Sequence, residues 1–172
     1  MTYSALPPFF GVQSGEQIGR IAGLIHELDP TRLSQLKSQY GITPDFKNEK
    51  FYLLKNSLYG DYSRNEFENG VHVAYASAIN DRIYKVFGFF SFAGPSETFV
   101  AVIQYVKGMD QFVLKSNESS MSPSGGSINF WEFEDGNVVL ETNRGIGAVY
   151  ITSNWIASIR LEKLSFFSRM FN

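Results

Sequence analysis

The 172-residue chain contains no cysteine, two histidines and no long block of charge of either sign. Without cysteine it can form neither disulfides nor thiolate metal sites, and it has no thiol nucleophile. Fifteen Lys and Arg are opposed by seventeen Asp and Glu, interspersed along the chain, so no basic stripe is predicted that would neutralise phosphates. We therefore expect no nucleic-acid partner.

Long apolar runs are also missing. None approaches the ~20 residues that a membrane-spanning helix requires. The first ten residues, MTYSALPPFF, lack the charged start and the continuous apolar stretch of a secretory signal. The simplest interpretation is a cytoplasmic protein, although export without such a signal stays open.

The motifs of catalysis, metal binding and cofactor binding are not found. His26 and His72 have no metal-ligand partner at a suitable spacing, and no nucleophile motif occurs. The segment NRGIG (143–147) lacks the lysine and the third glycine of a phosphate loop and is predicted to be a hairpin turn. We expect no cofactor, no metal and no catalytic residue.

Two pairs of carboxylates are candidates for acid–base chemistry. Glu132 and Glu134 lie two residues apart and project from one face of a predicted strand. Such a pair could transfer protons if one acid were desolvated, but beside the EDGN turn we interpret both as solvated charges. Glu66 and Glu68 have the same spacing and the same interpretation.

Aromatic residues, in contrast, are abundant. The chain has 16 Phe and 9 Tyr, which favour pleated surfaces and supply large buried areas. Its 44% hydrophobic and 19% charged residues are typical of a globular protein, and its length suits one domain over residues 1–172.

Residues 13–59 are predicted to be the helical part. In the segment 14–29, Ser14 and Gln17 have capping-box spacing, and apolar residues recur on one face. Two glycines, at 19 and 23, weaken this helix.

The next segment, 30–40, has stronger helix signals. Asp29 can cap the helix, Pro30 suits its first position, and Gly41 can end it in a left-handed conformation. A third helix is predicted within 44–59, with a short strand at KFYLLK as the alternative.

From Val71 to residue 162 the chain alternates β-type runs with turn residues, which predicts an antiparallel sheet. The predicted strands are 71–79, 82–92, 97–108, 111–116, 127–134, 137–142, 147–153 and 155–164. The second and third are apolar on both faces, which is typical of strands buried between two layers. The stretch VFGFFSFAG (86–94) is therefore interpreted as core, with the wall of a pocket as the alternative; Gly88 suits a bulge or bend.

Two further segments complete the chain. Residues 117–127, NESSMSPSGGS, are predicted to form a surface loop. Residues 160–172 are amphipathic, with basic and aromatic residues, and are predicted to be a short C-terminal helix on the core; contact with a membrane or a partner is the alternative. The fold class is thus α+β, in which two or three N-terminal helices pack on a twisted, mainly antiparallel meander sheet or partial barrel of about eight strands, closed by that helix.

The leading hypothesis for function is a non-catalytic module that binds another protein, such as a small inhibitor or immunity-type factor, or a self-assembling structural subunit. Exposed Tyr, Arg and Met residues in polar loops are typical of contact surfaces. The predicted partner-binding residues are Tyr62, Arg64, Asn65, Ser119 and Met121.

An alternative function is the carriage of an apolar small molecule in an aromatic-lined cavity. The predicted lining residues are Phe87, Phe89, Tyr105, Trp131 and Tyr150. An acid–base enzyme acting in the same cavity is a third possibility, and Glu132 would be its first residue to test.

Overall fold

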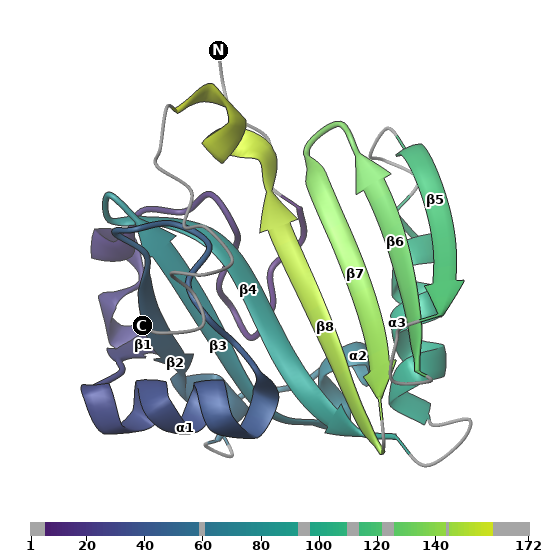
Figure 1. The fold of residues 1–172 in the computed structure, drawn as a ribbon, viewed down its shortest axis with the longest axis horizontal. Helices are drawn as coiled ribbons and strands as arrows, with labels where there is room; N and C mark the ends of the chain where they lie inside the picture. Colours follow the sequence, from purple (N-terminus) through teal and green to yellow (C-terminus); the bar gives the residue numbers. More distant parts are fainter. Residues whose placement is uncertain are drawn as a thin grey trace.

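The computed structural model describes residues 6–58, 61–92, 97–109, 114–121, 126–143 and 145–159. Its centre is an open eight-stranded antiparallel sheet (Figure 1). The strands are β1 (Ile25–Glu27), β2 (Lys50–Leu54), β3 (Val71–Ile79), β4 (Arg82–Ser91), β5 (Leu114–Met121), β6 (Ser127–Phe133), β7 (Gly136–Asn143) and β8 (Ile146–Ser153). This arrangement confirms the predicted α+β class with a mainly antiparallel sheet.

The strand order is β1-β2-β3-β4-β8-β7-β6-β5. Two four-stranded meanders, β1 to β4 and β5 to β8, are therefore joined side by side through the pairing of β4 with β8. In Figure 1 the two meanders form the left and right halves of the sheet. The strands β1 and β5 are its two edges.

Three α-helices flank this sheet: α1 (Pro30–Tyr40), α2 (Glu66–Asn69) and α3 (Glu97–Lys107). The predicted signals of the first helix are confirmed. The Asp29 side chain accepts a hydrogen bond from the backbone N–H of Arg32, Pro30 is the first helical residue, and Gly41 ends the helix with φ of 70°.

Each face of the sheet buries its own apolar cluster. The first cluster, on the face covered by α1, consists of Leu28, Leu36, Phe51, Leu53, Phe87, Phe89 and Ala148. On the opposite face, Phe90 and Val149 pack with Phe9 and Phe10 of the N-terminal segment and with Val102 of α3. Because β4 contributes to both clusters, the predicted two-sided burial of this strand is confirmed.

Gly88 was predicted to suit a bulge or a bend, and the bulge is wrong. Gly88 pairs regularly with Ala74, whereas the irregular register of β3 and β4 lies at other positions. A Cβ at Gly88 would lie 2.8 Å from Val71 Cγ1 and 3.0 Å from Phe9 Cζ. This glycine therefore gives the Phe9 ring space to pack directly on the sheet.

The helix predicted over 14–29 is wrong. This segment instead forms two 3₁₀ turns, Ile18–Arg20 and Ala22–Leu24, followed by β1. Backbone hydrogen bonds tie it to the β3–β4 hairpin, since Gly15 N–H donates to Ile83 and Ile18 N–H donates to Asp81. These long-range bonds replace the helical ones that two glycines disfavour.

The helix predicted within 44–59 is also wrong, and its alternative is confirmed. Residues Lys50–Leu54 form β2, and Lys55–Ser57 follow as a 3₁₀ turn. Four consecutive residues of β2 are buried, from Phe51 to Leu54. A strand between β1 and β3 buries both its faces, which explains an apolar run without strict alternation.

The strand predicted over 97–108 is α3, so that prediction is wrong as well. Thr98, Val102 and Val106 are its buried residues, at intervals of four, while Val100 is exposed. A short apolar run rich in β-branched residues has the same pattern in a buried strand and in a helix packed against a sheet. The packing of α3 on the sheet decides between them.

Two other predicted segments are corrected in part. Residues 117–121 of the predicted loop belong to β5, and the predicted strand over 155–164 begins as a 3₁₀ turn, Asn154–Ser158. Residues 122–125, 111–113 and 160–172 lie outside the described residues, and with them the predicted C-terminal helix. In the part of the chain that the structure describes, no helix is long and apolar enough to cross a membrane.

Candidate functional site

The first group of predicted partner-binding residues makes contacts inside the chain. Asn65 caps α2 by accepting a hydrogen bond from Glu68 N–H at 2.8 Å, while Glu68 Oε1 accepts one from Asn65 N–H. Glu68 Oε2 accepts hydrogen bonds from Phe10 N–H and from the Tyr62 hydroxyl. Glu68 is thus a buried anchor for the N-terminal segment, in contrast to the solvated charge predicted for it.

Arg64 is held in the same way. Its guanidinium donates to the backbone carbonyls of Ser57, at 2.6 Å, and Val71, at 3.2 Å, and it lies 5.2 Å from the centre of the Phe10 ring. These contacts join the segment before α2 to the 3₁₀ turn Lys55–Ser57, to β3 and to the N-terminal segment. Arg64 therefore has a structural role, and its role in partner binding stays a prediction.

Ser119 and Met121, the second group, lie on β5 at one edge of the sheet (Figure 1). The side chain of Ser119 donates to Asn129 Oδ1 of β6 at 2.9 Å. Met121 is 74% exposed, more than any other large apolar side chain in the described ranges. The edge of β5 is therefore an accessible surface with an apolar side chain at its end.

The predicted ligand-binding residues are divided between the two faces of the sheet. Phe87, Phe89 and Tyr150 belong to the α1 face, where the rings of Phe87 and Tyr150 stack with centroids 5.8 Å apart. Trp131 and Tyr105 belong to the opposite cluster. The structure therefore brings three of these five residues together and places the other two across the sheet.

A cavity of about 210 Å³ lies on the α1 face, between the end of α1 and the strands β4, β7 and β8. Its lining residues are Gln39, Tyr40, Phe89, Glu141, Asn143, Ile146, Ala148 and Tyr150. Two of the predicted ligand-binding residues, Phe89 and Tyr150, thus line one cavity. Tyr40, whose ring stacks on Phe89 with centroids 3.8 Å apart, was missed because only the packing of α1 brings it there.

A larger and more open cavity, of about 490 Å³, lies at the other end of the sheet, beside β2 and the β3–β4 turn. Its lining includes two lysines, Lys47 and Lys50, and two acids, Glu49 and Asp81. Glu49 is buried and paired with Lys85, whereas Lys47, Lys50 and Asp81 are exposed to solvent. Exposed charges of both signs are typical of a hydrated surface, so this cavity indicates no ligand class.

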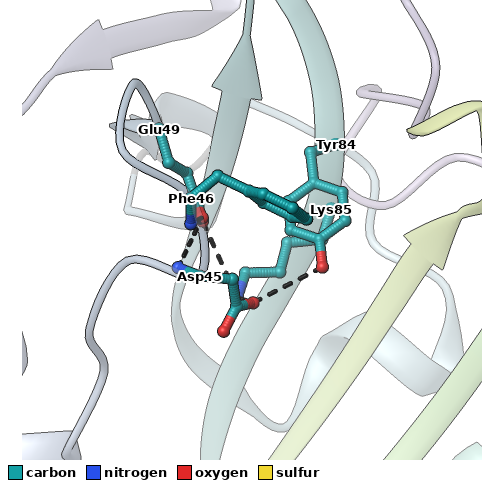
Figure 2. Close-up of polar contacts among 5 residues, drawn as sticks. All are labelled: Asp45, Phe46, Glu49, Tyr84 and Lys85. Atoms are coloured by element: carbon teal, nitrogen blue, oxygen red, sulfur yellow. Dashed lines mark hydrogen bonds and ion pairs between the residues drawn. The ribbon is translucent and has the colours of Figure 1, made fainter. Parts of the chain in front are cut away.

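A charged cluster next to β2 was not predicted from the sequence. Figure 2 shows Lys85 of β4 beside Asp45 and Glu49, which precede β2. Lys85 Nζ lies 3.3 Å from Asp45 Oδ2 and 3.8 Å from Glu49 Oε2. The Glu49 side chain is fully buried, and its Oε1 accepts the backbone N–H groups of Asp45 and Phe46.

An irregular register in the β3–β4 hairpin builds this cluster. Ser77 pairs with Lys85 and Ala78 with Ile83, so Tyr84 is an extra residue on β4. Such a bulge reorients side chains. As a result the Tyr84 hydroxyl also reaches Asp45 Oδ2, at 3.4 Å, although Tyr84 and Lys85 are consecutive in a strand.

Burial controls the electrostatics of the cluster. It raises the pKa of Glu49 above the ordinary value of 4.5, while Lys85 and the N–H of Asp45 act in the opposite direction. Burial, followed by the charge of Asp45, also raises the pKa of the Tyr84 hydroxyl. The lysine therefore compensates a carboxylate that cannot reach water.

A perturbed acid beside a lysine can mark a catalytic site. Here the charges are paired within the chain: Glu49 Oε1 accepts two backbone N–H groups, and Lys85 Nζ lies within 4 Å of both carboxylates, although Glu49 Oε2 accepts no hydrogen bond from a described residue. The cluster fixes the loop before β2 onto β4. The sequence signal that could have found it is Lys85 itself, a charge at the alternate position between the apolar residues Ile83 and Phe87 of a predicted strand.

The remaining titratable candidates are at the surface. Glu132, Glu134 and Glu66 are exposed, in line with solvated charges. His26 is exposed, and the ring of His72, also exposed, is hydrogen-bonded to Ser91. Among the described residues, no three metal-ligating side chains lie close enough to hold an ion.

Comparison with known proteins gives no match to a protein-family model, to a curated protein or to a solved structure.

Proposed function

We propose that this protein is a non-catalytic module that binds a partner protein by pairing an extended segment of the partner with the outer edge of β5. An inhibitor or immunity-type factor would act in this way. The observation that carries the proposal is the length of this edge: β5 has eight residues, whereas the opposite edge strand, β1, has three.

An edge strand exposes unpaired backbone N–H and C=O groups, and proteins usually shorten, charge or cover such edges. β5 pairs with β6 in regular register from Ser116 to Met121 and contains no proline. No described strand pairs with its outer side. A partner segment could therefore form a continuous ladder along β5, the mode known as β-strand addition.

The side chains of this edge support the proposal. Residues 117–121 are exposed, and Met121 ends the strand. Methionine adapts its shape to different partners and is enriched in protein interfaces. Backbone pairing would supply affinity, and the contact with Met121 would add specificity.

The experiment is site-specific photo-crosslinking in the cells that make the protein. A crosslinking residue is placed at position 119 or 121, with position 35 as the matched control, since Gln35 is exposed on α1 at a distance from the edge strand in sequence and in fold. We expect one discrete adduct from positions 119 and 121 and none from position 35.

Two proline variants make the test specific to the backbone. Neighbouring residues in an antiparallel strand direct their N–H groups to opposite sides. Of Ser119→Pro and Ser120→Pro, one therefore removes an outward N–H and leaves the β5–β6 ladder intact. That folded variant should lose the adduct seen at position 121. The proposal is contradicted if the adduct persists in that variant, or if the unsubstituted protein gives no adduct at either position 119 or position 121. An adduct of twice the chain mass identifies a second copy of the chain as the partner.

A further inference from the structure

The cavity on the α1 face is lined by aromatic rings and by a carboxylate. Aromatic rings of Tyr40, Phe89 and Tyr150 line it, and the polar groups at its side include the carboxylate of Glu141. Among the described residues that line it there is no lysine or arginine. The one formal charge that these residues bring to its wall is therefore negative.

The two polar side chains that β7 contributes, Glu141 and Asn143, each have an acceptor oxygen to which no described residue donates. Asn143 Oδ1 is a buried atom that no hydrogen bond from the described residues reaches. Glu141 is half-buried and makes no ion pair with any residue that the structure describes. A buried acceptor left unpaired costs free energy, so a ligand that supplies donors would be favoured here.

The charge of Glu141 acts on Tyr150, another lining residue of the cavity. Burial raises the pKa of the Tyr150 hydroxyl, and the negative charge of Glu141 raises it further. The carboxylate and the aromatic rings thus line the same cavity. A positive charge placed beside the carboxylate would be attracted by it, and any ring face turned to the cavity would add to that attraction.

We infer that this cavity binds a small organic ammonium ion with an apolar or aromatic body. The ammonium N–H groups would donate to Glu141 and to Asn143 Oδ1, and the body would lie against Phe89 and Tyr150. The volume, about 210 Å³, limits the size of the ligand. A cavity of about 150 Å³ is known to hold benzene, so a benzene ring with a one-carbon ammonium substituent fits.

This inference is independent of the β5 edge, because none of the cavity residues belongs to β5 or β6. Either proposal can therefore fail while the other holds.

The test uses the full chain and three probes of similar shape: benzylammonium, neutral benzyl alcohol and anionic benzoate. Binding is measured by calorimetry, and the side-chain NMR signals of Tyr40 and Tyr150 report whether the probe enters the cavity. We expect benzylammonium to bind about tenfold more tightly than benzyl alcohol, and benzoate more weakly than either.

Two variants locate the interaction. Glu141→Gln should weaken benzylammonium binding about tenfold and leave benzyl alcohol unchanged, since it removes the charge and keeps the shape. Tyr40→Leu should also weaken the binding of benzylammonium, because it removes an aromatic ring from the cavity wall. Glu134→Gln, the same substitution at an exposed position, is the matched control and should change neither affinity.

Equal affinities for the charged and neutral probes would overturn the inference, as would unchanged benzylammonium binding in Glu141→Gln or no binding of benzylammonium at all. A lysine side chain of a partner protein carries the same ammonium group. A lysine-containing tripeptide is therefore titrated as well, and a peptide that binds more tightly than benzylammonium through Glu141 would assign the cavity to a partner's lysine.

Discussion

Replacing Lys85 by methionine tests the buried charge cluster of Figure 2. Methionine keeps most of the apolar stem but removes the ammonium group, whose Nζ lies 5.5 Å from the centres of the Tyr84 and Phe87 rings. Glu49, whose side chain is fully buried, then loses the only cation within 4 Å among the described residues. We expect Lys85→Met to lower the free energy of unfolding by about 3–5 kcal/mol near neutral pH.

The distances support this magnitude. Glu49 Oε2 and Lys85 Nζ are 3.8 Å apart. Two unit charges at about 4 Å interact by about 4 kcal/mol at an effective dielectric constant of about 20. Asp45 adds little to the loss, because its side chain is 27% exposed and water can replace the lysine there.

The loss should depend on pH with a definite sign. Burial already raises the pKa of Glu49 above 4.5 in the folded protein, and the charge of Lys85 lowers it. Removing Lys85 raises that pKa further. Since an acid with a raised folded pKa binds its proton more tightly when folded, stability falls as pH rises from the unfolded pKa to the folded one. The effect of Lys85→Met should therefore be smaller at about pH 5 than at about pH 7.

Urea denaturation at both pH values measures this, with Lys47→Met as the control. Lys47 is exposed in the same loop and makes no ion pair with a described residue, so its substitution should change stability by less than about 0.5 kcal/mol. The double variant with Glu49→Gln should recover most of the loss, because the amide that replaces the carboxylate keeps an oxygen for the N–H groups of Asp45 and Phe46. An equal loss at both pH values, or no recovery in the double variant, would refute the reasoning.

Two further predictions concern the core. Phe87→Ala should lower the free energy of unfolding by about 3–5 kcal/mol. The loss for Phe89→Ala should be smaller by about 1 kcal/mol, because one side of Phe89 already borders the cavity. Equal losses in thermal or urea unfolding would argue against an open cavity there. Gly88→Ala should lower the free energy of unfolding by about 1–3 kcal/mol, because the added methyl group displaces Phe9. The control is Gly19→Ala, which has open space around it and should change stability by less than about 0.5 kcal/mol. If Gly88→Ala left stability unchanged, Phe9 would be able to move without cost.

Local signals predicted the elements that local interactions determine. The α1 helix was found from a cap, a proline and a terminal glycine that act within a few residues of one another. The strands β3 and β4 were found from dense apolar runs and a tight turn at Asn80 and Asp81, which both have positive φ.

The errors occurred where distant contacts decide the structure. The β-branched run of α3 is helical because it packs on the sheet, and the segment before β1 is held by hydrogen bonds to residues about 65 positions away. The predicted sheet and the sheet of the described residues both have eight strands, yet β1 and β2 are not among the predicted strands, while the strand predicted over 97–108 is α3 and the one predicted over 155–164 begins as a 3₁₀ turn.

The candidate sites divide in the same way. Phe89 and Tyr150 could be selected as aromatic residues on one face of adjacent strands. Tyr40 and Glu141 could not, because the contact of α1 with β7 and β8 cannot be deduced from spacing along the chain. The partners of Lys85 lie about 40 residues before it and depend on a bulge, which no sequence pattern here indicates.

The pairing of β4 with β8 has a consequence for the synthesis of the protein on the ribosome. β4, with seven of its ten residues buried in the finished structure, is complete at Ser91, but its second neighbour begins only at Ile146. At 5–20 residues per second this interval lasts roughly 3–10 s. During that time the strand β4 is an unpaired and highly apolar edge of the first meander. The nascent chain can aggregate through this edge until β8 is made, and a chaperone would have to act within the same interval.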